Sequence, residues 1–322
     1  MLKAGVLITG FGGPDRLEAV GPFMCNLMGR EPSPEVLARI CARYERIGGA
    51  SPLPGIAREL GDNVAAALSD AGREVPVAIG MRYTDPSIAE GVQRLADAGA
   101  DHVVLVTLSP FETQVTHGEY RAALEEALVE HEGMTASEAP LFSDLPAFVA
   151  LHTAAARVAL DSAAPGALLI FSAHSLPMSD AIADSSYVDG LRASADAVAA
   201  AAGLPEGAEA EIVPGIVAYG STAGDRAWAL AYQSQGVRGG EWLGPDTDAV
   251  IEAAAAAGAP GVVVVPIGFA TDHLETLYDL DVVAAERAAA AGVAFVRSAV
   301  PNAAPELAHD IASAVIESID RG

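Results

Sequence analysis

One stretch decides how the rest of this chain is interpreted: GVVVVPIGFATDHLETLYDLD, Gly261–Asp281. It opens with four valines, a run too short and too β-branched for a comfortable helix, which predicts a strand buried on both faces, as in a parallel sheet. Pro266 and Gly268 end that strand. Asp272, followed three residues later by Glu275, has the spacing of a helix capping box. We therefore expect a helix from Asp272, placed just past the carboxyl end of a strand, where open α/β sheets bind ligands.

The expected helix carries Asp272, Glu275 and Asp279 on one face, at positions i, i+3 and i+7. An ordinary solvated helix start has the same pattern, so this stretch alone leaves both interpretations open. A second loop favours the functional one: LLIFSAHSLP, Leu168–Pro177, is another apolar strand that leads into a polar turn. If both strands belong to one sheet, His174 and Glu275 face each other across a single crevice.

Five stretches, in order along nearly the whole chain, resemble the ferrochelatases, which insert ferrous iron into a porphyrin. Two of them are the stretches quoted above, and the others are RYERIGGASPL (Arg43–Leu53), IGMRYTDPSI (Ile79–Ile88) and YQSQGVRGGEWLGPD (Tyr232–Asp246). Any one motif is weak evidence, whereas five motifs in the right order are specific.

The alternation of expected strands and helices predicts an α/β fold. With the resemblance, it implies two Rossmann-like, chelatase-like domains with parallel sheets and an active-site cleft between them. The first domain is expected at residues 1–145 and the second at 146–322, with the helix 305–322 packing back on the first domain. Strands are expected at residues 2–9, 75–83, 102–110, 167–171, 211–220, 261–265 and 293–298. The segment after residue 220, through Trp242, is interpreted as a loop.

The resemblance implies a catalytic pair, His174 and Glu275. A neutral imidazole can bind Fe²⁺ or accept a pyrrole proton, and a carboxylate can relay protons to solvent. With Asp279, which continues the acidic line, these residues are the candidate metal ligands.

The resemblance also implies a set of substrate-binding residues: Phe11, Arg30, Arg43, Tyr44, Ser51 and Trp242. Arg43, Tyr44 and Ser51 match positions that hold propionates, and guanidinium and hydroxyl groups are suited to carboxylates. Phe11 and Trp242 are expected to grip the ring, although Phe11 cannot ligate iron as a tyrosine at that position can. The structural alternatives are an outward helix charge for Arg43 and a core side chain for Phe11.

Three further positions depart from the common family pattern. Cys25 stands where many relatives have arginine, and Glu112 stands where hydroxyl, amide or apolar residues are commoner. Val283 replaces a third acid, for which Asp272 or Asp281 is available to compensate.

Composition bounds the remaining choices. A formal charge of −25 argues against nucleic acid as a partner. No apolar run reaches the roughly 18 residues that span a bilayer, and the N-terminus lacks a signal-peptide pattern, so we expect a cytoplasmic protein without an integral membrane segment. Cys25 and Cys41 are the only cysteines, too few for the usual four ligands of an iron–sulfur cluster, and no tightly bound cofactor is expected.

The leading hypothesis is a lyase-type ferrochelatase of haem biosynthesis, acting on coproporphyrin III in preference to protoporphyrin IX, with Fe²⁺ as a substrate. Its expected partners are the porphyrin, ferrous iron and, transiently, other haem-pathway enzymes. The alternatives are a chelatase for cobalt or nickel with sirohydrochlorin, and a non-catalytic haem or porphyrin carrier. The presence of both His174 and Glu275 argues against a carrier, which needs no proton-accepting pair.

Overall fold

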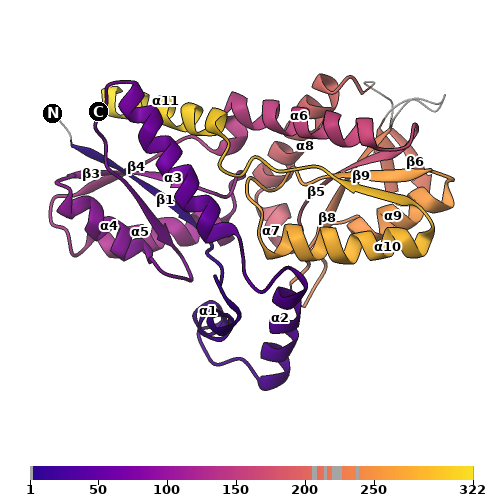
Figure 1. Cartoon of the computed structure of the whole chain (residues 1–322), viewed down its shortest axis with the longest axis horizontal. Helices are drawn as coiled ribbons and strands as arrows, with labels where there is room; N and C mark the ends of the chain where they lie inside the picture. Colours follow the sequence, from indigo (N-terminus) through magenta and orange to yellow (C-terminus); the bar gives the residue numbers. More distant parts are fainter. Residues whose placement is uncertain (1–2, 205–208, 214–215, 220–226, 237–238, 322) are drawn as a thin grey trace. The chain divides into compact units, whose positions relative to one another are not determined.

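The computed structural model describes residues 3–204, 209–213, 216–219, 227–236 and 239–321 (Figure 1). The chain divides into two compact units. The first comprises Met1–Phe148, Ala270–Leu274 and Pro301–Gly322, and the second comprises Val149–Phe269 and Glu275–Val300. No helix in the described part of the chain is long and apolar enough to cross a membrane.

The first unit is built on a four-stranded parallel sheet of order β2-β1-β3-β4. Its strands are β1 (Ala4–Gly10), β2 (Val77–Met81), β3 (His102–Thr107) and β4 (Thr135–Glu138). Figure 1 shows α3 and α11 on one side of the sheet and α4 and α5 on the other. These helices are α3 (Leu53–Asp70), α4 (Ile88–Asp97), α5 (Glu119–Leu128) and α11 (Pro305–Arg321).

A separate helical pair in the first unit has its own small core. It follows the short η1 (Leu17–Ala19) and consists of α1 (Val20–Met28) and α2 (Pro34–Arg46). Ser33 caps α2 by accepting a hydrogen bond from the Val36 backbone N–H, and proline stands at the first helical position.

The second unit has a six-stranded sheet of order β10-β9-β5-β8-β7-β6. Its strands are β5 (Leu168–His174), β6 (Glu209–Val213), β7 (Ile216–Tyr219), β8 (Trp228–Gln233), β9 (Gly261–Val265) and β10 (Ala294–Arg297). The helices are α6 (Pro146–Ser162), which begins in the first unit, α7 (Met178–Ala183), α8 (Ser186–Ala201), α9 (Thr247–Ala256) and α10 (Ala285–Ala291). All five residues of β9 are buried, because helices cover both faces of this central strand.

The predicted α/β class with parallel sheets is confirmed, with four differences in detail. Strand β4 was not expected, because its sequence TASE is polar; the strand forms by pairing in parallel with β3. Strand β8 lies in a segment that the sequence analysis interpreted as a loop. It forms by pairing with β5, which lies about 60 residues earlier and cannot be inferred from the neighbouring sequence. The single strand expected at 211–220 is instead the antiparallel pair β6 and β7, so the second sheet is mixed. Residues 214–215, 220–226 and 237–238 of these two expected segments lie outside the described residues.

The fourth difference concerns the helix after β9. It was expected from Asp272, but the regular segment is the π-helix η4 (Glu275–Ala284), because the Asp272 carboxylate accepts a hydrogen bond from Asn302. The domain boundary between residues 145 and 146, and a cleft between the domains, stay predictions.

Candidate active site

His174 ends β5 and is held by its neighbours. Its backbone carbonyl accepts a hydrogen bond from the buried hydroxyl of Tyr187 at 2.8 Å. The next residue, Ser175, donates its backbone N–H to Gln233 and its hydroxyl to Leu243, both at 2.8 Å. The His174 Nδ1 atom lies 2.5 Å from the Ser175 carbonyl, which can only accept, so Nδ1 carries a proton. The Nε2 atom is therefore the one available for chemistry.

Glu275 is the first residue of η4, and its carboxylate lies next to His174 Nε2. Its Oε1 atom lies 3.5 Å from His174 Nε2, and both side chains are about one-third exposed (34% and 35%). Two features of the backbone set this approach. Gly268 donates its N–H to Ser172, and a Cβ on Gly268 would lie 2.6 Å from the Ala173 Cα, so only glycine allows the loop after β9 to pass so close to β5. Gln233 Nε2 donates to the Glu275 carbonyl at 2.9 Å. The predicted adjacency of the two side chains is confirmed.

The electrostatics of the pair favour a bound proton. Burial acts to lower the pKa of His174, but the charge of Glu275 and the hydrogen bond with it outweigh burial and, helped by the Ser175 carbonyl and Asp279, raise the pKa to about 9. At neutral pH His174 is therefore an imidazolium beside the Glu275 carboxylate. It is a strong base once that proton leaves.

The other acids of this region have defined protein partners. Asp279, one turn along η4, accepts a short hydrogen bond from the Ser234 hydroxyl. Asp281 pairs with Arg297 through two bonds of 2.5 and 2.9 Å. Neither Asp281 nor Asp272, which is bonded to Asn302, extends the line of Glu275 and Asp279 in place of Val283. Among the described residues no three His, Cys, Asp or Glu side chains form a metal-holding group, and the role of Asp279 as a ligand stays a prediction.

Phe11 lies in the first unit, in an aromatic cluster that the sequence did not reveal. Its ring is 4.7 Å from that of Tyr83 and 6.2 Å from that of Phe23, measured between centroids. Tyr83 is pinned to it, since its backbone N–H donates to the Phe11 carbonyl at 3.1 Å. The GMRYT motif contained this tyrosine, but only the pairing of β1 with β2 places it beside Phe11.

Most of the predicted substrate-binding residues have structural surroundings that the sequence did not indicate. Tyr44 is only 2% exposed, inside the core of the α1–α2 pair. Ser51 is 6% exposed and its hydroxyl accepts a hydrogen bond from the Leu53 backbone at the start of α3. Arg43 is partly exposed in the last turn of α2, whereas Arg30 is exposed beyond the end of α1. Their contacts with a substrate stay predictions.

Trp242 lies in the second unit beside the His174 loop. It forms an isolated antiparallel bridge with Pro177, and its ring packs over Gly236, where a Cβ would come within 2.8 Å of the indole. The structure thus brings together His174, Glu275, Asp279 and Trp242 around the ends of β5, β8 and η4. The sequence missed Gln233 and Ser234 in this group because β8 was interpreted as loop.

The two units share a strand order, which identifies the positions of the first unit that correspond to His174 and Glu275. The order β2-β1-β3-β4 corresponds to β8-β5-β9-β10, and in each unit the third of these strands leads to a π-helical segment, η2 (Gln114–Gly118) or η4. The stretches FETQVTHGEY and FATDHLETLY then match at Phe, Thr and Tyr, which places His117 at the position of Glu275. The position of His174 falls on Gly12. Gly12 has φ +90°, and a side chain there would overlap the Thr84 hydroxyl.

The His117 side chain is buried and both of its ring nitrogens contact hydroxyl groups of the protein. It is 1% exposed, with Nε2 2.8 Å from the Thr107 hydroxyl and Nδ1 3.1 Å from that of Thr116. Glu112 is bound by Arg121 through two bonds of 2.8 and 3.0 Å. The unusual polar residues of this loop therefore form internal structure.

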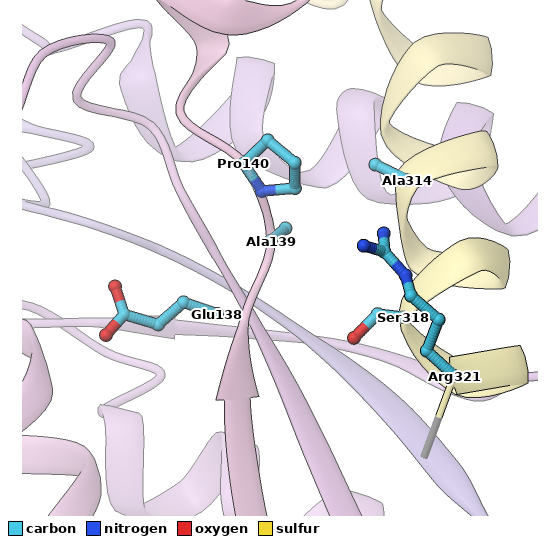
Figure 2. A pocket seen from close by; sticks show the side chains of 6 residues that line it. All are labelled: Glu138, Ala139, Pro140, Ala314, Ser318 and Arg321. Carbon is cyan, nitrogen blue, oxygen red and sulfur yellow. The ribbon is translucent and has the colours of Figure 1, made fainter.

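A pocket of about 450 Å³ lies elsewhere in the first unit (Figure 2). It is lined by Glu138, Ala139 and Pro140 after β4 and by Ala314, Ser318 and Arg321 of α11. In Figure 2 the Glu138 carboxylate points away from Arg321, and it is bound by Arg121. The pocket contains none of the predicted site residues.

Comparison with known proteins gives the family. A family model described as Ferrochelatase matches residues 3–319. The coproporphyrin III ferrochelatase of Mycolicibacterium smegmatis is 32% identical over 98% of this chain and 89% of that protein. That of Propionibacterium freudenreichii is 31% identical (98% and 87%), and that of Bacillus subtilis is 29% identical (99% and 99%).

Solved structures agree at the level of the fold. SirB from Bacillus subtilis with Fe³⁺ superposes with a TM-score of 0.56 at 11% identity, covering 98% of this chain and 96% of that one. CbiX, described as the terminal enzyme of sirohaem biosynthesis in denitrifying bacteria, gives 0.54 at 16% identity, covering 98% and 99%. With the family model matching almost from end to end, the chain belongs to the ferrochelatase family and is a lyase-type enzyme that inserts a metal ion into a porphyrin.

Proposed function

We propose that this chain inserts Fe²⁺ into coproporphyrin III during haem biosynthesis. The observation that carries the proposal is the His174–Glu275 pair, 3.5 Å apart and partly exposed at the carboxyl end of the central strands. The names of the three relatives support coproporphyrin as the tetrapyrrole. SirB and CbiX share only the fold with this chain, so they lend no support to the sirohydrochlorin alternative.

The pair supplies the proton chemistry that insertion needs. A porphyrin must lose two pyrrole protons as the metal enters. At neutral pH His174 first releases its own Nε2 proton to solvent through Glu275; the neutral Nε2 then accepts one pyrrole proton and passes it to Glu275, which regenerates the base for the second. Because Nδ1 is held by the Ser175 carbonyl, the imidazole keeps Nε2 toward the reaction throughout.

The same groups are suitable ligands for the arriving metal. Imidazole nitrogen and carboxylate oxygen both bind Fe²⁺. Since the pKa of His174 is raised to about 9, metal binding at neutral pH must displace its proton. We therefore expect Fe²⁺ uptake to release a proton.

The substrate side of the proposal rests on Phe11 and Arg43. The partly exposed Phe11, packed beside Tyr83, offers an apolar contact for the macrocycle, and the Arg43 guanidinium suits a propionate. Cys25 and Cys41 are free thiols, and we expect purified protein to contain no iron–sulfur cluster, as tested by its visible absorbance and acid-labile sulfide.

The decisive experiment incubates the protein anaerobically with Fe²⁺, Co²⁺ or Ni²⁺ and with coproporphyrin III, protoporphyrin IX or sirohydrochlorin, followed by absorbance. We expect the fastest insertion with Fe²⁺ and coproporphyrin III. Porphyrin binding without insertion would identify a carrier, and preference for sirohydrochlorin would identify the alternative chelatase.

Two variants then test the pair, with the exposed His309→Ala as a control that keeps wild-type activity. His174→Ala should nearly abolish insertion and leave porphyrin binding intact. Glu275→Gln should lower turnover strongly, and the double variant should be little worse than the worse single one, because groups acting as a unit are not additive. Wild-type rates in either single variant would refute the assignment.

A further inference from the structure

Asn302 forms a reciprocal clasp with Asp272. The backbone N–H of Asp272 donates to Asn302 Oδ1 at 2.8 Å, and Asn302 Nδ2 donates to Asp272 Oδ2 at 3.1 Å. The two bonds fix which end of the amide is oxygen, since an N–H must meet an acceptor and a carboxylate must meet a donor. Both side chains are partly buried.

The backbone of Asn302 is shaped for this clasp. Its φ is +51°, one of two positive values among the described non-glycine residues. Asparagine tolerates this left-handed conformation better than most residues. Its N–H donates to the Ala270 carbonyl at 2.7 Å, and the next residue, Ala303, accepts a hydrogen bond from Asn63 of α3 at 2.8 Å. The clasp is therefore anchored to a long helix.

The clasp holds the segment that ends where the catalytic carboxylate begins. Ala270–Leu274 belongs to the first unit and is tied at Ala270 and Asp272 by Asn302. At its other end, Leu274 packs against the aromatic and apolar cluster of the α1–α2 pair. Glu275 follows directly, so the position of its Cα is limited by a segment fixed at three points.

We infer that Asn302 is a positioning residue for metal insertion, which through Asp272 holds Glu275 at the distance from His174 that proton transfer requires. This inference rests on the proposed function. It also assigns Asp272 a structural use, as the partner of Asn302, in place of the missing third acid. A displacement of about 1 Å at a reacting group can cost on the order of a hundredfold in rate, so a distant clasp can govern turnover.

A double-mutant cycle tests the inference. Asn302→Asp places two carboxylates against each other. Asp272→Asn keeps an oxygen that can accept from Asn302, so it is mild. In the combined variant the new carboxylate at 302 accepts from both the backbone N–H and the new amide at 272, which restores the clasp with its donors reversed. Asn302→Gly removes both side-chain bonds while permitting the same backbone conformation.

Two measurements are made on each variant: kcat and KM for coproporphyrin and Fe²⁺, and, at one fixed pH without substrate, the imidazole NMR signals of His174. We expect Asn302→Asp and Asn302→Gly to lower kcat at least tenfold, with the porphyrin KM within twofold of wild type and the His174 signals displaced. Asp272→Asn should stay within threefold of wild type, and the combined variant should return to its level in both measurements.

Several outcomes would overturn the inference. One is that Asn302→Gly leaves both kcat and the His174 signals unchanged. Another is that the combined variant has a kcat no higher than that of Asn302→Asp. A lower melting temperature with normal kcat per folded molecule would show a merely structural clasp. If the wild type inserts no metal, the proposed function fails, and the His174 signals still decide whether Asn302 positions Glu275. If Asn302→Asp does not fold, the glycine and combined variants give the answer.

Discussion

The pKa of His174 should fall when Glu275 loses its charge. At 3.5 Å and an effective dielectric constant of about 20, two unit charges interact by roughly 4–5 kcal/mol. Because both side chains are one-third exposed, solvent screening reduces this to about 2 kcal/mol, which corresponds to about 1.5 pH units at 1.36 kcal/mol each. We therefore expect Glu275→Gln to bring the pKa of His174 from about 9 down to roughly 7.5.

The titration can be followed by NMR of the imidazole nitrogens between pH 5 and 10. Glu252→Gln, a surface carboxylate bonded to Arg287, is the matched control and should leave the pKa of His174 unchanged. A pKa that stays near 9 in Glu275→Gln, or one already near 6.5 in the wild type, would refute the electrostatic account of the pair.

The same pKa fixes the sign of a stability effect. A folded-state pKa of about 9, above the usual 6.5, means that the folded chain holds a proton that the unfolded chain has lost between these values. The stabilisation by the His174–Glu275 pair is fully present below pH 6.5 and is lost as the pH rises through about 9. In Glu275→Gln that loss should be confined to the narrow window between pH 6.5 and roughly 7.5, which chemical denaturation at several pH values can measure.

Three further predictions follow from burial, close approach and charge. Burial lowers the pKa of His152 to about 3, so below pH 6.5 the unfolded chain binds a proton that the folded chain does not. The free energy of unfolding should therefore fall by about 2 kcal/mol from pH 7 to pH 5. His152→Leu should remove this pH dependence of stability, and the exposed His309→Gln should not. Gly268→Ala should lower stability by about 1–3 kcal/mol and slow insertion, because its methyl group overlaps β5, whereas Gly55→Ala, with open space around it, should not lower the melting temperature. Arg43→Ala should weaken coproporphyrin binding by about 1–3 kcal/mol, roughly 5- to 150-fold in Kd, and an unchanged Kd would show Arg43 to be a surface charge only.

The sequence by itself determined the elements whose signals are local. Four valines followed by proline and glycine indicate the buried strand β9, and an apolar run into SAHSLP indicates β5. Because parallel neighbouring strands end at one edge, these two patterns also predicted that His174 and Glu275 meet. The ordered motifs gave the family without any structure.

Only the tertiary structure decided the features that depend on partners distant in sequence. Strand β8 exists because it pairs with β5, and it delivers Gln233 and Ser234 to the site. Tyr44 matches a substrate-binding position, yet packing of α1 on α2 buries it.

The start of η4 also depends on a residue distant in sequence. Asp272 and Glu275 have the spacing of a capping box, but Asn302, 30 residues away, takes the Asp272 side chain and its backbone N–H. The regular helix then begins at Glu275 as a π-helix. A capping preference of about 1 kcal/mol between neighbours three residues apart is outweighed when two hydrogen bonds with a residue distant in sequence compete for the same groups.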